Sequence, residues 1–85
     1  KLNFMTAIKT RPDLKVIYTN TITSIVERGK TKHGNFFFEI FFDNDTWGLY
    51  FNNINAISYK EGDLVTYEHI TYGLNYIIKF YKPKH

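Results

Sequence analysis

The residue types best suited to chemistry in this 85-residue chain are aromatic rings and lysines, and both are concentrated in particular segments. Residues 35–52 read NFFFEIFFDNDTWGLYFN, so rings crowd two neighbouring stretches. A strand with period two would carry one set on each face: Phe36, Phe38, Ile40 and Phe42 on one, and Phe37, Glu39, Phe41 and Asp43 on the other. A small barrel buries only one face of a strand. Rings on the other face must therefore either pack under a loop or stack on a ligand.

Positive charge is unevenly distributed along the chain, whose net charge is +3. Residues 1–33 carry seven Lys or Arg against two acids, whereas residues 34–78 carry one Lys against six acids. Arg28, Lys30 and Lys32 are expected to lie together in one loop, residues 28–33, just before the aromatic stretch. This segregation favours a polyanion on one side of the molecule, although lysine-rich termini and loops also simply keep a protein soluble.

Patterns of β-branched and aromatic residues predict five strands, at residues 15–27, 35–43, 46–52, 64–70 and 75–81. The first is long, and its alternation shifts between Ile22 and Ile25, which indicates a bulge or bend. Asn44 and Asp45 are expected to form a tight turn, and residues 53–60 a short helix or a loop. We predict an all-β protein with an arm or short helix at 1–14, a barrel at 15–82 and a tail at 83–85.

This order of elements resembles the OB-fold, a five-stranded Greek-key barrel. Three segments carry the resemblance: Gly34-Asn-Phe-Phe-Phe-Glu-Ile40 with the following Asp43-Asn-Asp, Glu61-Gly-Asp-Leu-Val-Thr-Tyr67, and Tyr72-Gly73 with Tyr76-Ile-Ile-Lys79. Together they are similar to small, phage-type single-stranded DNA-binding proteins and, more distantly, to cold-shock domains. The second and third strands lack the aromatic motifs of cold-shock domains, so no residue role is carried over from that family.

Single-strand binders of the OB type combine stacking rings with basic groups around their second and third strands. On this chain the expected nucleic-acid-binding residues are the rings of Phe37, Phe41, Trp47, Tyr50 and Tyr72 and the cations of Arg28, Lys30, Lys32 and Lys79. Each ring also has an alternative interpretation as core packing or loop cover, and a carboxylate at Glu39 would repel phosphate.

The register between the second and third strands decides which rings face outward. A two-residue turn would put Phe37, Phe41 and Tyr50 on the outer face, with Phe41 over Gly48, and would turn Trp47, Leu49 and Phe51 inward. A slip of one residue would instead put Trp47 outside, because slipping reverses every side chain of a strand.

Catalytic and metal-binding patterns are missing from the sequence. The histidines have no ligand-like spacing, no serine lies in a nucleophile motif, and no glycine loop has a phosphate-cradling ending. We therefore expect no enzyme, no catalytic residue, no metal and no cofactor. Cysteine, a signal peptide and an apolar run of about 20 residues are also missing, which favours the cytoplasm of a bacterial or phage-infected cell over a membrane.

The sequence therefore predicts a protein that coats single-stranded DNA with little sequence preference, by base stacking and phosphate contacts. Two alternatives use the same rings. One is an RNA-binding, cold-shock-like protein, and the other is a protein-interaction or oligomerisation module. In the second, the outward rings form an apolar patch that binds a partner protein or a second copy of the chain, as in a homo-oligomer. Exposed rings stack on sugars as well, but the basic segment argues against an oligosaccharide ligand.

Overall fold

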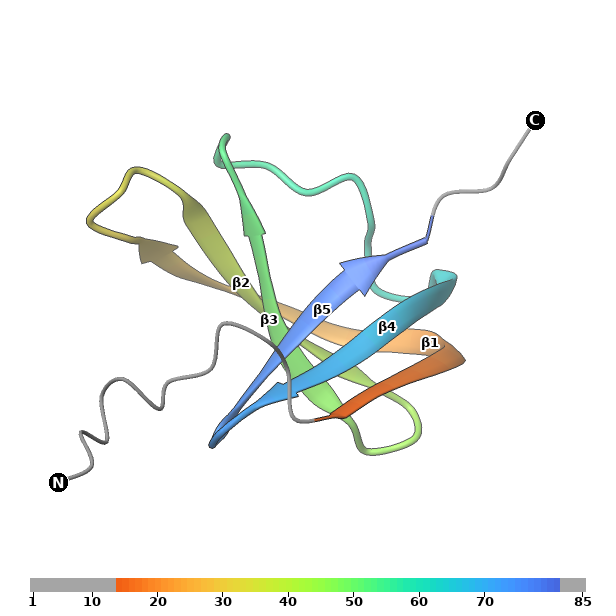
Figure 1. Cartoon of the computed structure of the whole chain (residues 1–85). Coiled ribbons are helices and arrows are strands. Elements are labelled where there is room, and N and C mark those ends of the chain that lie inside the picture. Colours follow the sequence, from red (N-terminus) through yellow and green to blue (C-terminus); the bar gives the residue numbers. More distant parts are fainter. Residues whose placement is uncertain (1–13, 82–85) are drawn as a thin grey trace, which may run out of the picture.

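The β-branched and aromatic segments form five strands within residues 14–81, the part of the chain that this computed structural model describes (Figure 1). They are β1 (Leu14–Lys30), β2 (Phe36–Phe42), β3 (Trp47–Asn52), β4 (Leu64–Tyr72) and β5 (Asn75–Phe80). The all-β prediction is confirmed. The predicted arm and tail lie outside the described residues, except that Leu14, assigned to the arm, is the first residue of β1.

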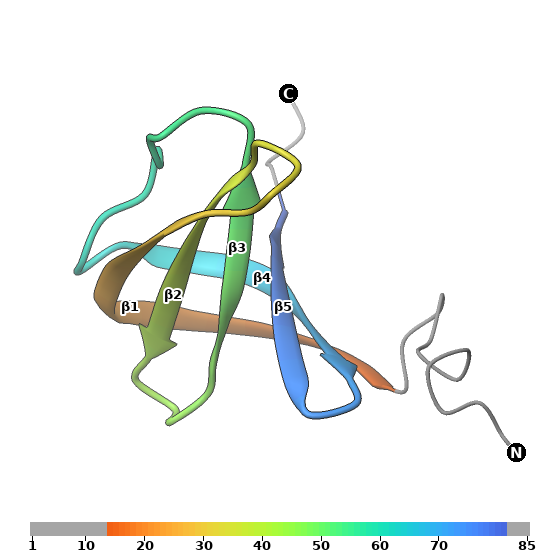
Figure 2. The ribbon, with the colours of Figure 1, turned by 90° about the vertical axis from the view of Figure 1, so that its left-hand side faces the viewer.

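The strands close into a barrel in the order β1-β2-β3-β5-β4, which is compatible with an OB-like barrel. Figure 2 shows β2, β3 and β5 side by side, and β1 runs behind them to reach β4. All neighbouring strands are antiparallel except β3 and β5, which are parallel and pair at Leu49 and Ile77. This single parallel pairing completes the barrel.

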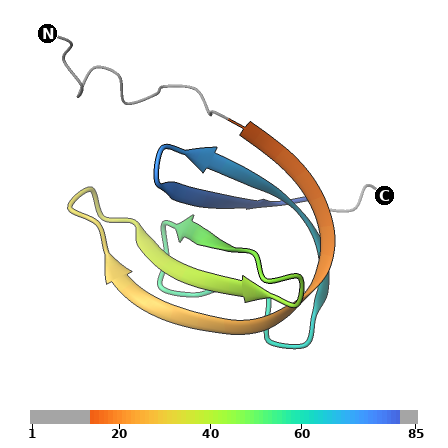
Figure 3. The same ribbon diagram turned by 90° about the horizontal axis from the view of Figure 1, so that it is seen from below.

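β1 is a long, curved strand that pairs with two neighbouring strands, as seen from below in Figure 3. Its first half pairs with β4 and its second half pairs with β2. The register with β2 shifts between Ile22 and Ser24, and again between Glu27 and Gly29. These irregularities confirm the predicted bend. The strand also continues to Lys30, three residues beyond its predicted end.

The core fills the barrel with side chains from four of the strands: Ile22, Phe38, Ile40, Phe42, Val65, Tyr67 and Ile78. Tyr67 is fully buried, and its ring stacks on Phe42 with centroids 3.9 Å apart. Its hydroxyl donates to Asn20 Oδ1 at 3.3 Å and lies 2.9 Å from the Thr46 hydroxyl. The buried polar end of this tyrosine therefore has hydrogen-bond partners.

The connection between β3 and β4 is a loop, so the alternative of a short helix at residues 53–60 is wrong. Its first part is held by Asn52, whose Nδ2 donates to the Ala56 carbonyl at 2.8 Å. Its last part is held to β1, because the Ile22 amide donates to the Asp63 carbonyl at 2.9 Å. Between these points Tyr59 packs against the core, and its ring stacks on Phe80 at 4.0 Å.

Candidate functional site

The turn between β2 and β3 decides which side chains share the outer face of the barrel. It contains three residues, Asp43 to Asp45, because the Phe42 amide donates to the Thr46 carbonyl at 2.9 Å. Asp45 adopts a left-handed conformation with φ of 67°, which Asp and Asn tolerate better than most residues. Asn44 Oδ1 accepts hydrogen bonds from the amide and the hydroxyl of Thr46.

This turn shifts β3 by one residue from the two-residue-turn register. Phe41 pairs with Trp47 and not with Gly48. Because a one-residue shift reverses the faces of a strand, Trp47, Leu49 and Phe51 lie on the outer face and Gly48 lies inside. The slipped register, which placed Trp47 outside, is therefore the correct one, and the inward prediction for Leu49 and Phe51 is wrong.

Tyr50 does not lie on the outer face, contrary to the two-residue-turn prediction. It pairs with Phe38, and its ring packs at one end of the core. The centroid of its ring lies 6.4 Å from that of Phe38 and 5.2 Å from that of Phe80. The ring is only partly buried there, so it still reaches the surface beside β5.

Four aromatic rings share the outer face of β2 and β3: Phe37, Phe41, Trp47 and Phe51. Phe37 and Phe51 are stacked at 5.7 Å with 25° between their planes, and Phe51 is 39% exposed. Trp47 meets the edge of Tyr76 at 5.2 Å. All except Phe51 are half-buried, so the face is an apolar surface with several accessible ring edges and planes.

The acidic residue on this face is neutralised by a neighbouring arginine. Arg28 Nε donates to Glu39 Oε1 at 2.8 Å, and the Arg28 Nη2 donates to the same oxygen. The Glu39 side chain is 18% exposed, whereas that of Arg28 is 50% exposed. Glu39 therefore presents little net negative charge, but it also holds a cation that was predicted to contact phosphate.

The predicted basic residues are divided between β1 and the loop that follows it. Arg28 and Lys30 lie within β1, and Lys32 is exposed in the loop. Lys30 Nζ lies 5.4 Å from the centroid of Phe36, which places it at the end of the barrel and not over the outer rings. Thr31 shapes the loop, since its hydroxyl accepts from the amide of Asn35 at 3.2 Å.

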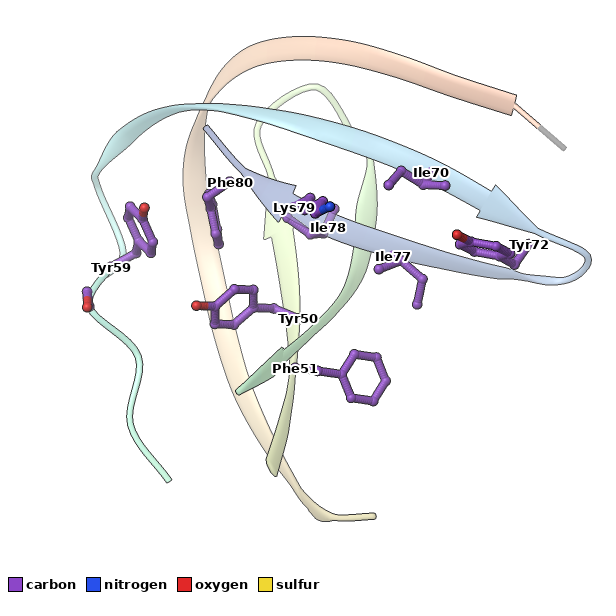
Figure 4. A pocket seen from close by; sticks show the side chains of 10 residues that line it. Tyr50, Phe51, Tyr59, Ile70, Tyr72, Ile77, Ile78, Lys79 and Phe80 are labelled. Atoms are coloured by element: carbon purple, nitrogen blue, oxygen red, sulfur yellow. The ribbon is translucent and has the colours of Figure 1, made fainter. Parts of the chain in front are cut away.

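A groove of about 420 Å³ lies beside the outer rings, at the place where β3 and β5 separate (Figure 4). Three of the predicted site residues line it, Tyr50, Tyr72 and Lys79, together with Phe51. Its complete lining is Tyr50, Phe51, Ser58, Tyr59, Ile70, Tyr72, Ile77, Ile78, Lys79 and Phe80. Tyr72 was predicted to lie in a turn, but it is the last residue of β4 and pairs with Asn75.

The structure thus brings Phe37, Phe41 and Trp47 together on one face and places Tyr50, Tyr72 and Lys79 in the adjoining groove. Sequence reasoning did not include Phe51, Tyr59 or Phe80 in the site. The outward position of Phe51 depends on the register of β3. The available signal for a three-residue turn was the residue type of Asp45, since Asp tolerates the left-handed conformation that this residue adopts. Tyr59 lies in a loop whose path the local sequence does not specify.

His69 is the histidine most enclosed by other rings among residues 14–81. Its Nε2 donates to the Trp47 carbonyl at 2.9 Å, and its ring stacks on Tyr76 at 4.7 Å. Over the same range, no group of three or more acids and histidines is placed to hold a metal ion. The described strands and loops also include no helix with the length and hydropathy of a membrane span.

Comparison of the chain with protein-family models, with curated proteins and with solved structures finds no match.

Proposed function

We propose that this barrel binds single-stranded DNA, with little sequence preference, across the outer face of β2 and β3. The observation that carries the proposal is the shared placement of Phe37, Phe41, Trp47 and Phe51 on that face. Rings on the solvent side of a small barrel are not needed for its core. Flat, accessible rings suit unpaired bases, since every base has a π-face.

The charge around this face supports a polyanionic ligand. Gly29, which lies between Arg28 and Lys30 in β1, pairs with Phe37, and Phe37 pairs with Phe51. The end of β1 that carries these two cations therefore lies in one row with the two stacked rings. Lys32 is exposed in the adjoining loop. Contacts of this kind hold the backbone of a strand without reading its sequence, and they make affinity fall with salt.

DNA is named ahead of RNA because the turn-and-strand segments resemble phage-type single-stranded DNA-binding proteins. Stacking itself does not separate the two, since RNA is distinguished by contacts to its 2′-hydroxyl. An oligo-U competitor against labelled oligo-dT measures the preference, and equal competition would extend the proposal to both nucleic acids.

Fluorescence anisotropy with labelled oligo-dT tests the proposal. The wild-type protein is expected to bind the single strand better than a duplex of the same length. The Phe37→Leu/Phe51→Leu variant should lose roughly five- to 150-fold in affinity for each base no longer stacked, which corresponds to about 1–3 kcal/mol per base. Tyr81→Leu is the matched control, because it removes an exposed ring that follows β5. No binding by the wild type at low salt rejects the function.

Self-association is the second candidate, favoured by the apolar side chains between the rings. Leu49 and Ile77 pair on the outer face, and Phe51 is exposed beside them. An apolar patch of this kind also fits a second protein surface. Light scattering separates the two functions: a dimer that persists in high salt and is lost in Phe37→Leu/Phe51→Leu, without oligonucleotide binding, supports association instead.

A further inference from the structure

The groove between β3 and β5 has two aromatic compartments with a lysine between them (Figure 4). We infer that it holds two consecutive bases of a single strand, one in each compartment, with the phosphate that links them at Lys79. This inference rests on the proposed function and deepens it, because it makes the groove a binding site for a dinucleotide step.

The first compartment lies at the end of the barrel core where the ring of Tyr50 packs. It contains the rings of Tyr50, Tyr59 and Phe80, which Figure 4 shows gathered on one side of the groove. Tyr59 stacks on Phe80 at 4.0 Å, and Tyr50 meets Phe80 edge-on at 5.2 Å. These contacts fix the rings before a ligand arrives. A base entering here meets ring surfaces and two tyrosine hydroxyls, the groups that suit stacking and hydrogen bonding.

The second compartment lies on the outer face of the sheet. Phe51, Tyr72 and Ile77 line it, and Ile70 lies next to Ile77 on β4. Ile70 is only 6% exposed although it does not belong to the core cluster, so this side of the sheet has a small apolar floor of its own. A base lying on this floor would be covered by rings from β3 and β4.

Lys79 is placed between the compartments and is available for a ligand. It is exposed on β5, and within residues 14–81 its ammonium group forms no ion pair. Glu68 lies directly opposite on β4, but its carboxylate pairs with Lys15 at 3.7 Å. The lining of the groove contains no acid. A phosphate here would therefore gain a cation and meet no carboxylate among the lining residues.

The groove is continuous with the proposed binding face on β2 and β3, so one polymer could occupy both. Phe51 belongs to both, since it lines the groove and stacks on Phe37. β3 and β5 run parallel from the Leu49–Ile77 pair, so Phe51 and Lys79 each lie two residues further along and on the same outer side. A single-stranded oligonucleotide that crosses from β2 over β3 therefore reaches the groove without a break in the row of rings.

The dinucleotide d(TpT) tests this inference, with NMR titration of the aromatic resonances as the readout. We expect the ring signals of both Tyr59 and Tyr72 to shift together. Lys79→Gln should weaken binding of d(TpT), but it should not change binding of the analogue whose linkage is an uncharged methylphosphonate. Lys60→Gln is the control, because the charge of Lys60 is already paired with Asp63 at 3.4 Å.

Ring variants with labelled oligo-dT separate this inference from the proposed function. Tyr59→Leu and Tyr72→Leu should each lower affinity by roughly five-fold or more, and Lys79→Gln, an exposed substitution, provides the check if a ring variant fails to fold. If the wild type binds oligo-dT and all three variants bind equally well, the two-base groove is wrong and the outer face stands alone. If the wild type does not bind, the proposed function itself fails.

Discussion

Of the five glycines of the chain, Gly48 is the one whose surroundings leave no room for a side chain. A methyl group at this position would lie 2.6 Å from Ile78 Cδ1 and 2.7 Å from Ile78 Cγ1. Ile78 is buried, and β3 and β5 meet next to it. The missing side chain of Gly48 therefore lets the isoleucine fill the core where the barrel closes.

Gly48→Ala is accordingly expected to destabilise the protein by about 1–3 kcal/mol, the usual cost of overpacking a well-filled core. Urea unfolding followed by circular dichroism measures the change. Adding Ile78→Val to the same variant removes the Cδ1 atom that would clash, and should restore part of the loss. A Gly48→Ala variant as stable as the wild type would show that this contact does not limit the core.

Tyr67 gives the stability of the barrel a dependence on alkaline pH. Burial raises the pKa of its phenol above the usual value, against the opposing effects of its hydrogen bond to Thr46 and of the nearby Asn44 side chain. A raised folded-state pKa means that the stabilisation is fully present below the unfolded value of about 10, and is lost as pH rises through the folded value.

The free energy of unfolding should therefore decrease above about pH 10, where the unfolded phenol ionises first. Tyr67→Phe should flatten this decrease while costing about 0.5–1.5 kcal/mol at neutral pH for the lost hydrogen bonds. Part of the slope remains in the variant, since burial also raises the pKa of Tyr59. Denaturant unfolding at pH 7 and pH 10.5 gives both numbers, and an unchanged slope in Tyr67→Phe would contradict this role.

At the scale of the elements, the sequence predicted the strands better than their register. Alternation and β-branched residues located all five strands, and the shift between Ile22 and Ile25 located the bend in β1. The faces of β2 were also correct, because Phe38, Ile40 and Phe42 are buried. When a strand carries rings on both faces, its inward face can be recognised from the sequence only if the other face also carries acids. In β2, Glu39 marks the outward face in this way.

The site could be predicted only in part because it depends on a backbone detail of one turn. Phe37, Phe41 and Lys79 follow from the alternation of β2 and β5 alone. Trp47 and Phe51 follow only once Asp45 is known to be left-handed, since this adds one residue to the turn. The compartment at Tyr59 depends on tertiary contacts of the β3–β4 loop with Phe80, which no local pattern encodes.

The pair of Arg28 and Glu39 limits how strongly the outer face attracts a polyanion. Glu39→Gln removes the carboxylate and frees the guanidinium, so affinity for oligo-dT should rise severalfold and depend more steeply on salt. Glu27→Gln is the matched control, since it makes the same change of charge on β1 opposite the buried Phe38. Anisotropy titrations compare them, and weaker binding by Glu39→Gln would show that the carboxylate contacts the ligand.

At the scale of the whole molecule, opposite charges lie at opposite ends of the β2–β3 hairpin. Lys32 lies in the loop that precedes β2, and Asp43 and Asp45 lie in the turn that follows it. A bound strand is therefore expected to keep its phosphates near the lysine end and its bases over the rings. In such an arrangement the contacts between lysine and phosphate supply affinity, and the stacking rings accept any base sequence.

Lys32→Gln should consequently weaken binding and reduce the slope of log affinity against log salt by about 0.7, the value for one phosphate contact on a single strand. Lys60→Gln should leave the slope unchanged, because that lysine is paired with Asp63. Titrations at four salt concentrations give each slope. Equal slopes for Lys32→Gln and the wild type would remove this loop from the interface.

The most direct test of the account is the fluorescence of Trp47, the one tryptophan of the chain, which lies on the outer face opposite Phe41. Titration with oligo-dT at low salt is expected to quench it to saturation, and the midpoint should move to higher oligonucleotide concentration when salt is raised. An emission that stays constant at low salt while the protein remains folded would contradict the claim that bases stack on this face.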